Sequence, residues 1–194
     1  VANKSIEFIT FSTRGNGTLF GELTSSTSNE VRSGASCSSN TRGVFAGSRT
    51  ADPSPANVNN IIEYITIATL GNSIDFGDLT AASNSGKGTS NNVRGVFAGG
   101  YISPAEINTI QYITIATTGN ASDFGDSIWS GAYKGGTSNG TRGIWVSGRQ
   151  QPSPGRENII EFVTIATTGN SADFGDSAVR DGNGSTSDSH GGLS

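Results

Sequence analysis

Residues 110–126 read IQYITIATTGNASDFGD, and this stretch decides the fold because it occurs four times in the chain. Two close copies read IEYITIATLGNSIDFGD at 62–78 and IEFVTIATTGNSADFGD at 160–176, and a more divergent copy reads IEFITFSTRGNGTLFGE at 6–22. The first isoleucines of successive copies are 56, 48 and 50 residues apart. A repeat of this length is typical of solenoids, propellers and repeat arrays.

A second motif alternates with the first. It reads TRGVFAG at 41–47, VRGVFAGG at 93–100 and TRGIWVSG at 141–148. The chain ends on SHGGLS at 189–194, which aligns as a degenerate fourth copy. The sequence therefore predicts one repeat domain over 1–194, with units at about 1–40 plus 189–194, 41–92, 93–140 and 141–188.

The composition indicates an all-β protein. The 194 residues include 28 glycines, only 14% are charged, and short runs of Ile, Val, Thr, Tyr and Phe lie between stretches rich in Gly, Asn and Ser. Such runs are typical of strands separated by turns. We expect long strands such as 61–69, short strands such as 93–100, irregular polar connectors at 25–40 and 82–92, and Pro-containing loops at 48–59, 101–108 and 149–157.

The long strand carries apolar residues on both faces. Ile62 and Tyr64 alternate with Glu63 and Ile65 along the strand, so one face of the sheet receives the first pair and the opposite face the second. A strand of this kind is buried on both sides, as inner strands are when sheets stack face to face. One unit cannot bury both faces alone, so stacking between units is expected.

These features predict a small β-propeller of four blades. Blades of four strands need about 40–50 residues. The first long strand and the terminal segment 189–194 are each half of a unit, and we expect them to pair and close the ring. The alternative is a segment of a longer propeller or of a β-solenoid.

Net charge and cysteine content argue against several functions. The formal net charge of −4 leaves no basic footprint for nucleic acid, and no apolar run approaches the ~18 residues of a membrane-spanning helix. A single cysteine, Cys37, excludes an internal disulfide and a cysteine-based zinc site. We therefore expect no cofactor, no metal, no nucleic acid and no membrane insertion.

The motifs resemble the kelch-like repeats of tail and other virion structural proteins of marine and cyanobacterial bacteriophages. The resemblance rests on RGVFAGG at 94–100, on the long-strand motif with its Gly-Asn turn, and on the C-terminal SHGGL. Gly99, Gly100, Tyr112 and Phe124 occupy roughly the places of the Gly-Gly pair, the Tyr and the later Trp of a kelch repeat. The resemblance implies a structural and binding role in a virion or at a cell surface, without catalysis.

Some charged residues recur at the same place in each unit, which favours a structural role. The acidic pairs follow the Gly-Asn turns, where we expect them to shape turns rather than bind Ca²⁺, which needs six to eight oxygen ligands. The arginines of the second motif, with His190 in the last copy, are expected to bridge neighbouring blades rather than form an anion-binding ring. These residues are Asp75, Asp78, Asp123, Asp126, Asp173, Asp176, Arg42, Arg94, Arg142 and His190.

Residues that depart from the repeat are candidates for individual function. The third unit contains Trp129 and Tyr133, Tyr101 lies in the loop before it, and Arg149 and Arg156 flank a polar loop. Aromatic rings beside polar loops suit stacking on sugar rings or contact with a protein partner. Trp145, by contrast, is interpreted as an enlarged core Phe of its repeat.

The sequence thus predicts a non-enzymatic structural or receptor-binding module of a phage virion, associated with the tail. It would be extracellular, belong to an oligomeric assembly, and bind host glycans or another virion protein. The alternatives are a secreted or cell-surface repeat protein that forms filaments, and a glycan-active enzyme. The enzyme would need two facing carboxylates, and the repeat-breaking acids Glu22, Glu106, Glu157 and Asp181 share no evident face.

Overall fold

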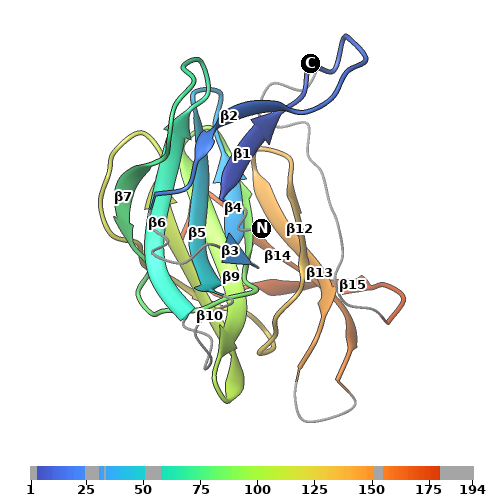
Figure 1. The fold of residues 1–194 in the computed structure, drawn as a ribbon. Coiled ribbons are helices and arrows are strands. Elements are labelled where there is room, and N and C mark those ends of the chain that lie inside the picture. Colours follow the sequence, from blue (N-terminus) through green and yellow to red (C-terminus); the bar gives the residue numbers. More distant parts are fainter. Residues whose placement is uncertain (1–3, 25–30, 33, 51–57, 151–154, 180–194) are drawn as a thin grey trace.

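The structure, a computed structural model, describes residues 4–24, 31–32, 34–50, 58–150 and 155–179 (Figure 1). These residues form β-strands and no helix, which confirms the all-β prediction. The strands are β1 Ser5–Phe8, β2 Thr18–Glu22, β3 Val31–Arg32, β4 Ala35–Ser38, β5 Arg42–Thr50, β6 Val58–Thr66, β7 Ile74–Asp78, β8 Lys87–Ser90, β9 Arg94–Ile102, β10 Ala105–Thr114, β11 Ser122–Asp126, β12 Gly135–Ser138, β13 Arg142–Gly148, β14 Glu157–Thr164 and β15 Ala172–Asp176.

Three antiparallel sheets repeat one strand order. They are β4-β5-β6-β7, in which β3 also pairs with β5, then β8-β9-β10-β11, then β12-β13-β14-β15. The hairpin β1-β2 is a two-stranded counterpart of the last two strands of each sheet. In every sheet the Arg-Gly motif forms the second strand, the long motif the third, and Asp-Phe-Gly-Asp the outermost fourth.

The first strand of each sheet comes from a polar stretch that the sequence analysis interprets as an irregular connector. Strands β4, β8 and β12 contact one another across successive sheets. Ser90 Oγ donates to Ser38 O at 2.9 Å, and Ser138 Oγ donates to Ser90 O at 2.7 Å. A Cβ on Gly88 would lie 2.1 Å from Ser36 O, so residues without bulk are required here. Each sheet therefore begins within a polar stretch rather than after it.

The outer strands are joined by a repeated contact between one sheet and the next. Gly119 N donates to Phe76 O at 2.7 Å, and Asp78 N donates to Asn120 Oδ1 at 3.0 Å. The same pair of bonds links the turn at 71–72 to β2 and the turn at 169–170 to β11. Each of these three Gly-Asn turns thus caps the outer strand of the preceding sheet or hairpin.

The core lies between neighbouring sheets. Phe76 of β7 is buried with Ile113 and Ile115, which belong to the following sheet. Phe124 of β11 is buried in the same way with Val163 and Ile165. Because inner strands contact inner strands and outer strands contact turns, the sheets follow one another in a propeller-like arrangement, with β7 and β15 on opposite flanks in Figure 1.

Ring closure by residues 189–194 stays a prediction, because that segment lies outside the described residues. Within the described residues the array has two uncovered ends. Phe174 of β15 is 52% exposed, whereas its counterparts Phe76 and Phe124 are each 2% exposed. No helix in the described part of the chain has the length and apolarity needed to cross a bilayer.

Candidate functional site

The residues that depart from the repeat gather at the junction of the second and third full sheets. Ala132 and Arg149 form an isolated antiparallel bridge, with mutual backbone hydrogen bonds of 2.9 and 2.8 Å. Tyr133 N donates to Ser85 O at 2.9 Å, which ties the third sheet to the second. Tyr101 lies directly opposite Glu106 in the β9-β10 ladder.

Tyr133 adopts a backbone conformation that bulky residues rarely take. Its φ is 57°, in the left-handed region, and the aligned residue of the preceding repeat, Ser85, has a φ of 61°. The turn is therefore a property of the repeat, and the aromatic ring is a property of this unit. The aromatic ring, and not the shared backbone conformation, therefore makes Tyr133 a candidate for function.

Arg149 connects Tyr133 to a buried carboxylate. Its guanidinium carbon lies 4.9 Å from the centre of the Tyr133 ring, within the range of a cation–π contact. Its Nη2 lies 3.6 Å from Glu106 Oε1, and the side chains of Arg149 and Glu106 are 33% and 1% exposed. Sequence analysis identified Tyr101, Tyr133 and Arg149 but gave Glu106 no role at this place. We name these four residues the Tyr133 surface.

Trp129 lies beneath this surface rather than on it. The residue is 8% exposed, and its ring packs so tightly that a Cβ on Gly131 would lie 2.2 Å from it. Lys134 Nζ lies 4.4 Å from the ring centre, and Trp129 Nε1 has no acceptor among the described residues. The indole faces are therefore not available for stacking on a ligand.

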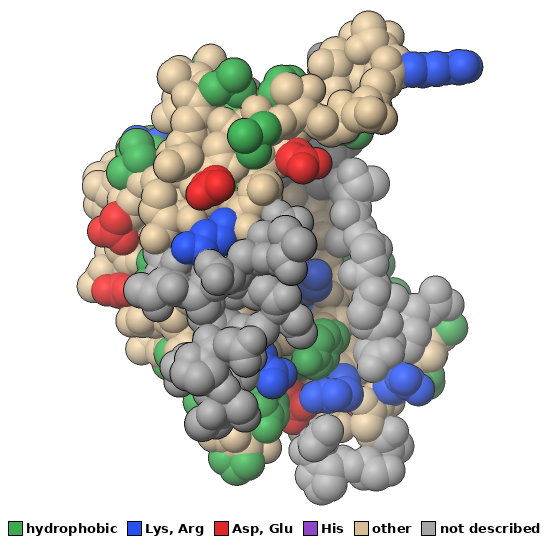
Figure 2. All heavy atoms as spheres, viewed as in Figure 1, with side chains coloured by type: hydrophobic (Ala, Val, Ile, Leu, Met, Phe, Trp, Pro, Cys, Tyr) green, Lys and Arg blue, Asp and Glu red, His purple; other side chains and the backbone are tan. Residues whose placement is uncertain are grey.

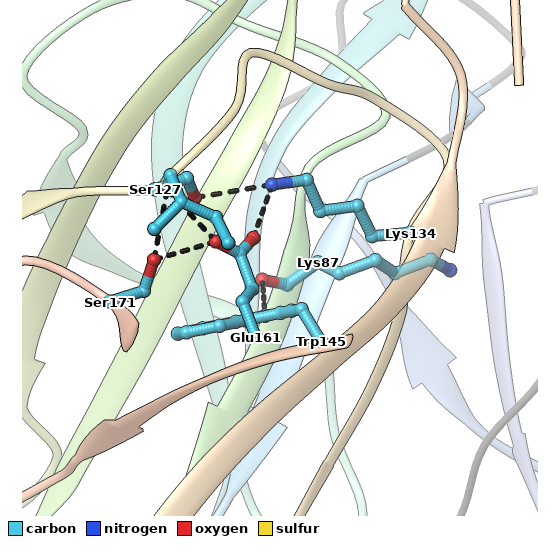
Figure 3. A network of polar contacts seen from close by, with 7 residues as sticks. Lys87, Ser127, Lys134, Trp145, Glu161 and Ser171 are labelled. Carbon is cyan, nitrogen blue, oxygen red and sulfur yellow. Dashed lines mark hydrogen bonds and ion pairs between the residues drawn. The ribbon is translucent and has the colours of Figure 1, made fainter. Parts of the chain in front are cut away.

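Lys134, which lies over the Trp129 ring, forms a buried polar network with Glu161. Figure 3 shows this network around Glu161. Lys134 Nζ donates to Glu161 Oε1 at 2.6 Å and to Ser127 Oγ at 3.1 Å. Ser171 Oγ and the backbone N of Ile128 donate to Glu161 Oε2 at 2.6 and 3.1 Å. Desolvation lowers the pKa of Lys134, while attraction and hydrogen bonding from Glu161 oppose that shift.

The equivalent side chain accepts a backbone hydrogen bond at the other junctions. Glu63 Oε2 accepts from Thr24 N at 3.2 Å, and Gln111 Oε1 accepts from Thr80 N at 2.8 Å. The network around Glu161 is thus the repeat's junction with a lysine added. Sequence analysis missed Lys134, although the alignment holds a signal, since Gly34 and Gly86 stand at its place in the other units.

The remaining candidate residue, Arg156, is exposed and precedes β14. It lies on the β13-β14 loop that begins at Arg149, and residues 151–154 of that loop lie outside the described residues.

Two of the three repeated arginines bridge neighbouring sheets. Arg42 Nη1 donates to Ile115 O at 2.7 Å, and Arg94 Nη1 donates to Ala166 O at 2.8 Å, in each case one sheet further along the chain. Each of the three guanidinium groups also lies over an aromatic ring of its own sheet. The pairs are Arg42 over Tyr64, Arg94 over Tyr112 and Arg142 over Phe162. His190 lies outside the described residues.

The repeated acidic residues lie at the surface of the outer strands. Five of the six, all except the half-buried Asp78, are exposed. Asp173 Oδ1 accepts from Gly175 N at 3.1 Å, which is a turn contact within the strand. No group of three or more His, Cys, Asp or Glu side chains suited to a metal ion occurs among the described residues.

Comparison with known proteins adds fold information alone. No protein-family model and no curated protein matches the chain. Among solved structures, that of YjhT matches with a TM-score of 0.74 at 10% sequence identity, over 92% of this chain and 61% of the YjhT chain. This chain therefore spans less than two thirds of the length of the structure it matches, and at this identity the likeness shows that the two share an all-β, propeller-like fold.

Proposed function

We propose that the protein is a non-enzymatic binding module of a phage virion, associated with the tail, and that the Tyr133 surface binds glycan. The observation that carries the proposal is the stack of Arg149 on Tyr133 above a buried Glu106. The second full sheet supplies Tyr101 and Glu106, and the third supplies Tyr133 and Arg149, so two neighbouring sheets hold these groups in place.

The chemistry of this surface suits hydroxyl-rich, neutral sugars. The Tyr133 ring and the Arg149 plane offer apolar faces with polar edges, as sugar-binding sites do. Glu106 offsets the charge of Arg149, so no net positive charge selects an anionic ligand. Such a site is weak alone, and several copies on one particle would raise the effective affinity through multivalency.

The virion assignment is supported by the resemblance of the repeat motifs to those of phage tail proteins. Mass spectrometry of purified phage particles tests it, and we expect peptides of this chain in particles and not in the soluble fraction of uninfected host cells. A four-bladed ring closed by residues 189–194 is the finer form of the fold, and it stays a prediction.

A glycan array of host surface polysaccharides tests the ligand. Tyr133→Ser installs the residue that the preceding repeat carries at the same backbone conformation, so the turn is kept and the ring is lost. We expect it to weaken glycan binding at least about tenfold, which corresponds to about 1.4 kcal/mol. Tyr133→Phe keeps the ring and should retain most binding, and Arg149→Gln should lose it.

Arg49→Gln is the matched control, because Arg49 occupies the position of Arg149 in the first full sheet. It should bind as the unmodified protein does. If the unmodified protein binds no glycan, the ligand is another virion protein, and co-purification from particles with and without Tyr133→Ser would identify the contact. Equal binding by Tyr133→Ser and the unmodified protein would remove this surface from the function.

A further inference from the structure

Three outer strands of this chain receive the same turn from the next sheet. In each case a Gly N–H donates to a Phe carbonyl, and an Asn Oδ1 accepts from the N–H of the acidic residue two places further on. The fit is close, because a Cβ on Gly77 or Gly125 would lie 2.5 Å from the backbone of the incoming turn. Strand edge and Gly-Asn turn are thus complementary surfaces that recur within one molecule.

Strand β15 carries the same edge, and among the described residues nothing occupies it. Phe174 and Asp176 stand where Phe124 and Asp126 stand in β11, yet no described backbone group bonds their outward N–H and C=O groups. A Cβ on Gly175 would meet nothing within 4 Å. The ring centres of Phe162 and Phe174 are 5.9 Å apart, as are those of Tyr112 and Phe124. Strand β15 therefore packs on β14 as β11 packs on β10, and it differs in having no described turn over it.

The first hairpin carries the complementary turn, and no strand edge among the described residues lies beneath it. Residues 15–17 align with the other Gly-Asn turns and are exposed. Ile9 and Phe11 are 60% and 97% exposed, whereas the aligned Ile113 and Ile115 are buried beneath Phe76. Glu7 is exposed too, whereas the aligned Glu63, Gln111 and Glu161 are buried at junctions. In Figure 2 the tip of this hairpin projects from the rest of the molecule, mostly tan and with one basic side chain at its end.

We propose that β15 binds the Gly15-Asn16-Gly17 turn of a second copy of this chain, head to tail. The turn of the second copy would donate from Gly15 to Phe174 O and accept at Asn16 from Asp176 N, and Ile9 and Phe11 would cover Phe174. The contact is heterologous, since it joins two different surfaces, and it builds closed rings or open filaments according to the angle between copies.

Complementation between two variants tests the proposal. Asn16→Arg removes the acceptor and adds bulk on the turn, and leaves β15 intact. Gly175→Ala places a Cβ where the incoming backbone must lie, and leaves the turn intact. We expect the unmodified chain to associate with rising concentration in analytical ultracentrifugation, and each variant to be monomeric. An equimolar mixture of the two variants should form dimers and nothing larger. The intact turn of Gly175→Ala can bind the intact edge of Asn16→Arg, and the two surfaces left over are both altered.

The controls separate this contact from damage to the fold. Asn92→Arg adds the same charge at an exposed loop position, and Gly169→Ala adds a Cβ in open space at a φ of 154°, similar to the 137° of Gly175. Both should associate as the unmodified chain does, and thermal unfolding checks that all variants fold. A chain that stays monomeric at every concentration overturns the proposal. This outcome includes a monomer in which a cross-link joins Asn16 to Asp176 of the same molecule. Association that survives both variants, or a mixture that stays monomeric, overturns it as well.

Discussion

Lys134 Nζ lies 2.6 Å from Glu161 Oε1, and both side chains are buried between the second and third full sheets. At the preceding junction the corresponding residues are Gly86 and Gln111, and the buried Leu79 stands where Ser127 does. One junction is thus uncharged where the next is ionic, within a single chain. The two junctions offer an internal comparison of how a buried ion pair affects stability.

Removing one charge of this pair should be costly. Lys134→Met leaves Glu161 buried without its cation, and we expect a loss of about 3–5 kcal/mol in the free energy of unfolding. The triple variant Ser127→Leu, Lys134→Gly, Glu161→Gln recreates the preceding junction and should recover most of that loss. Urea denaturation of the three proteins measures both values. If Lys134→Met is as stable as the unmodified protein, water or another group solvates Glu161 in that variant.

Trp145 fills the place of Phe45 and Phe97 in the other repeats and adds a hydrogen bond. It is fully buried, and its Nε1 donates to Lys87 O at 3.1 Å. Trp145→Phe restores the residue of the other repeats but leaves that carbonyl without its donor, at a cost of about 1–3 kcal/mol. Thermal unfolding monitored by circular dichroism measures the loss. No loss would show that a neighbouring donor or water replaces the indole.

The Cys37 thiol should be unreactive in the folded protein. Although the residue as a whole is half-buried, its Sγ faces Gly95, on which a Cβ would lie 2.4 Å away. Desolvation raises the pKa of the thiol from 9.0 to about 12. A colorimetric thiol reagent at pH 8 should therefore label Cys37 only after denaturation.

The same shift predicts a pH dependence of stability. Between pH 9 and about 12 the unfolded chain loses the Cys37 proton while the folded chain keeps it. Because the unfolded state then binds fewer protons, stability falls as pH rises through this window. Denaturant titrations at pH 8 and pH 10 should show a smaller fall for Cys37→Ala than for the unmodified protein. Equal slopes would show that the thiol is solvated.

Glycine at the outer strand should matter where a turn covers it and not where the edge is open. Gly125→Ala and Gly175→Ala share a positive φ, 147° and 137°, but only the former places a Cβ 2.5 Å from the Gly169 backbone. We expect Gly125→Ala to be less stable by about 1–3 kcal/mol more than Gly175→Ala, measured on dilute protein. Equal losses of stability in the two variants would show that backbone strain alone destabilises them.

The long strands and outer strands could be predicted because β-branched and aromatic residues mark them in every copy. The inner strands could not, because Lys87-Gly-Thr-Ser90 and its counterparts have the composition of a loop. Their extended conformation is imposed by neighbours, through ladder bonds to β9 and the contacts of Gly88 with Ser36. Intrinsic strand preference is weak compared with such tertiary context.

The candidate site was predictable where a residue breaks the repeat. Tyr101 and Tyr133 stand out in the alignment, whereas Arg149 has an arginine, Arg49, at its place in the first full sheet; the structure links the three candidates through Glu106. That acid could not be assigned, because its burial depends on the Arg149 side chain reaching it from another sheet. Trp129 stands out equally, but the sequence does not show that Gly131 and Gly148 allow its ring to sink into the core.

Each joint in this molecule uses the same parts, a Gly-Asn turn on one side and a Phe-Gly-acid edge on the other. A genetic duplication or deletion of one period would therefore leave every remaining joint with a matching pair. The number of repeats in the chain can therefore change without the evolution of a new interface. Single units can still acquire features of their own, such as Tyr133.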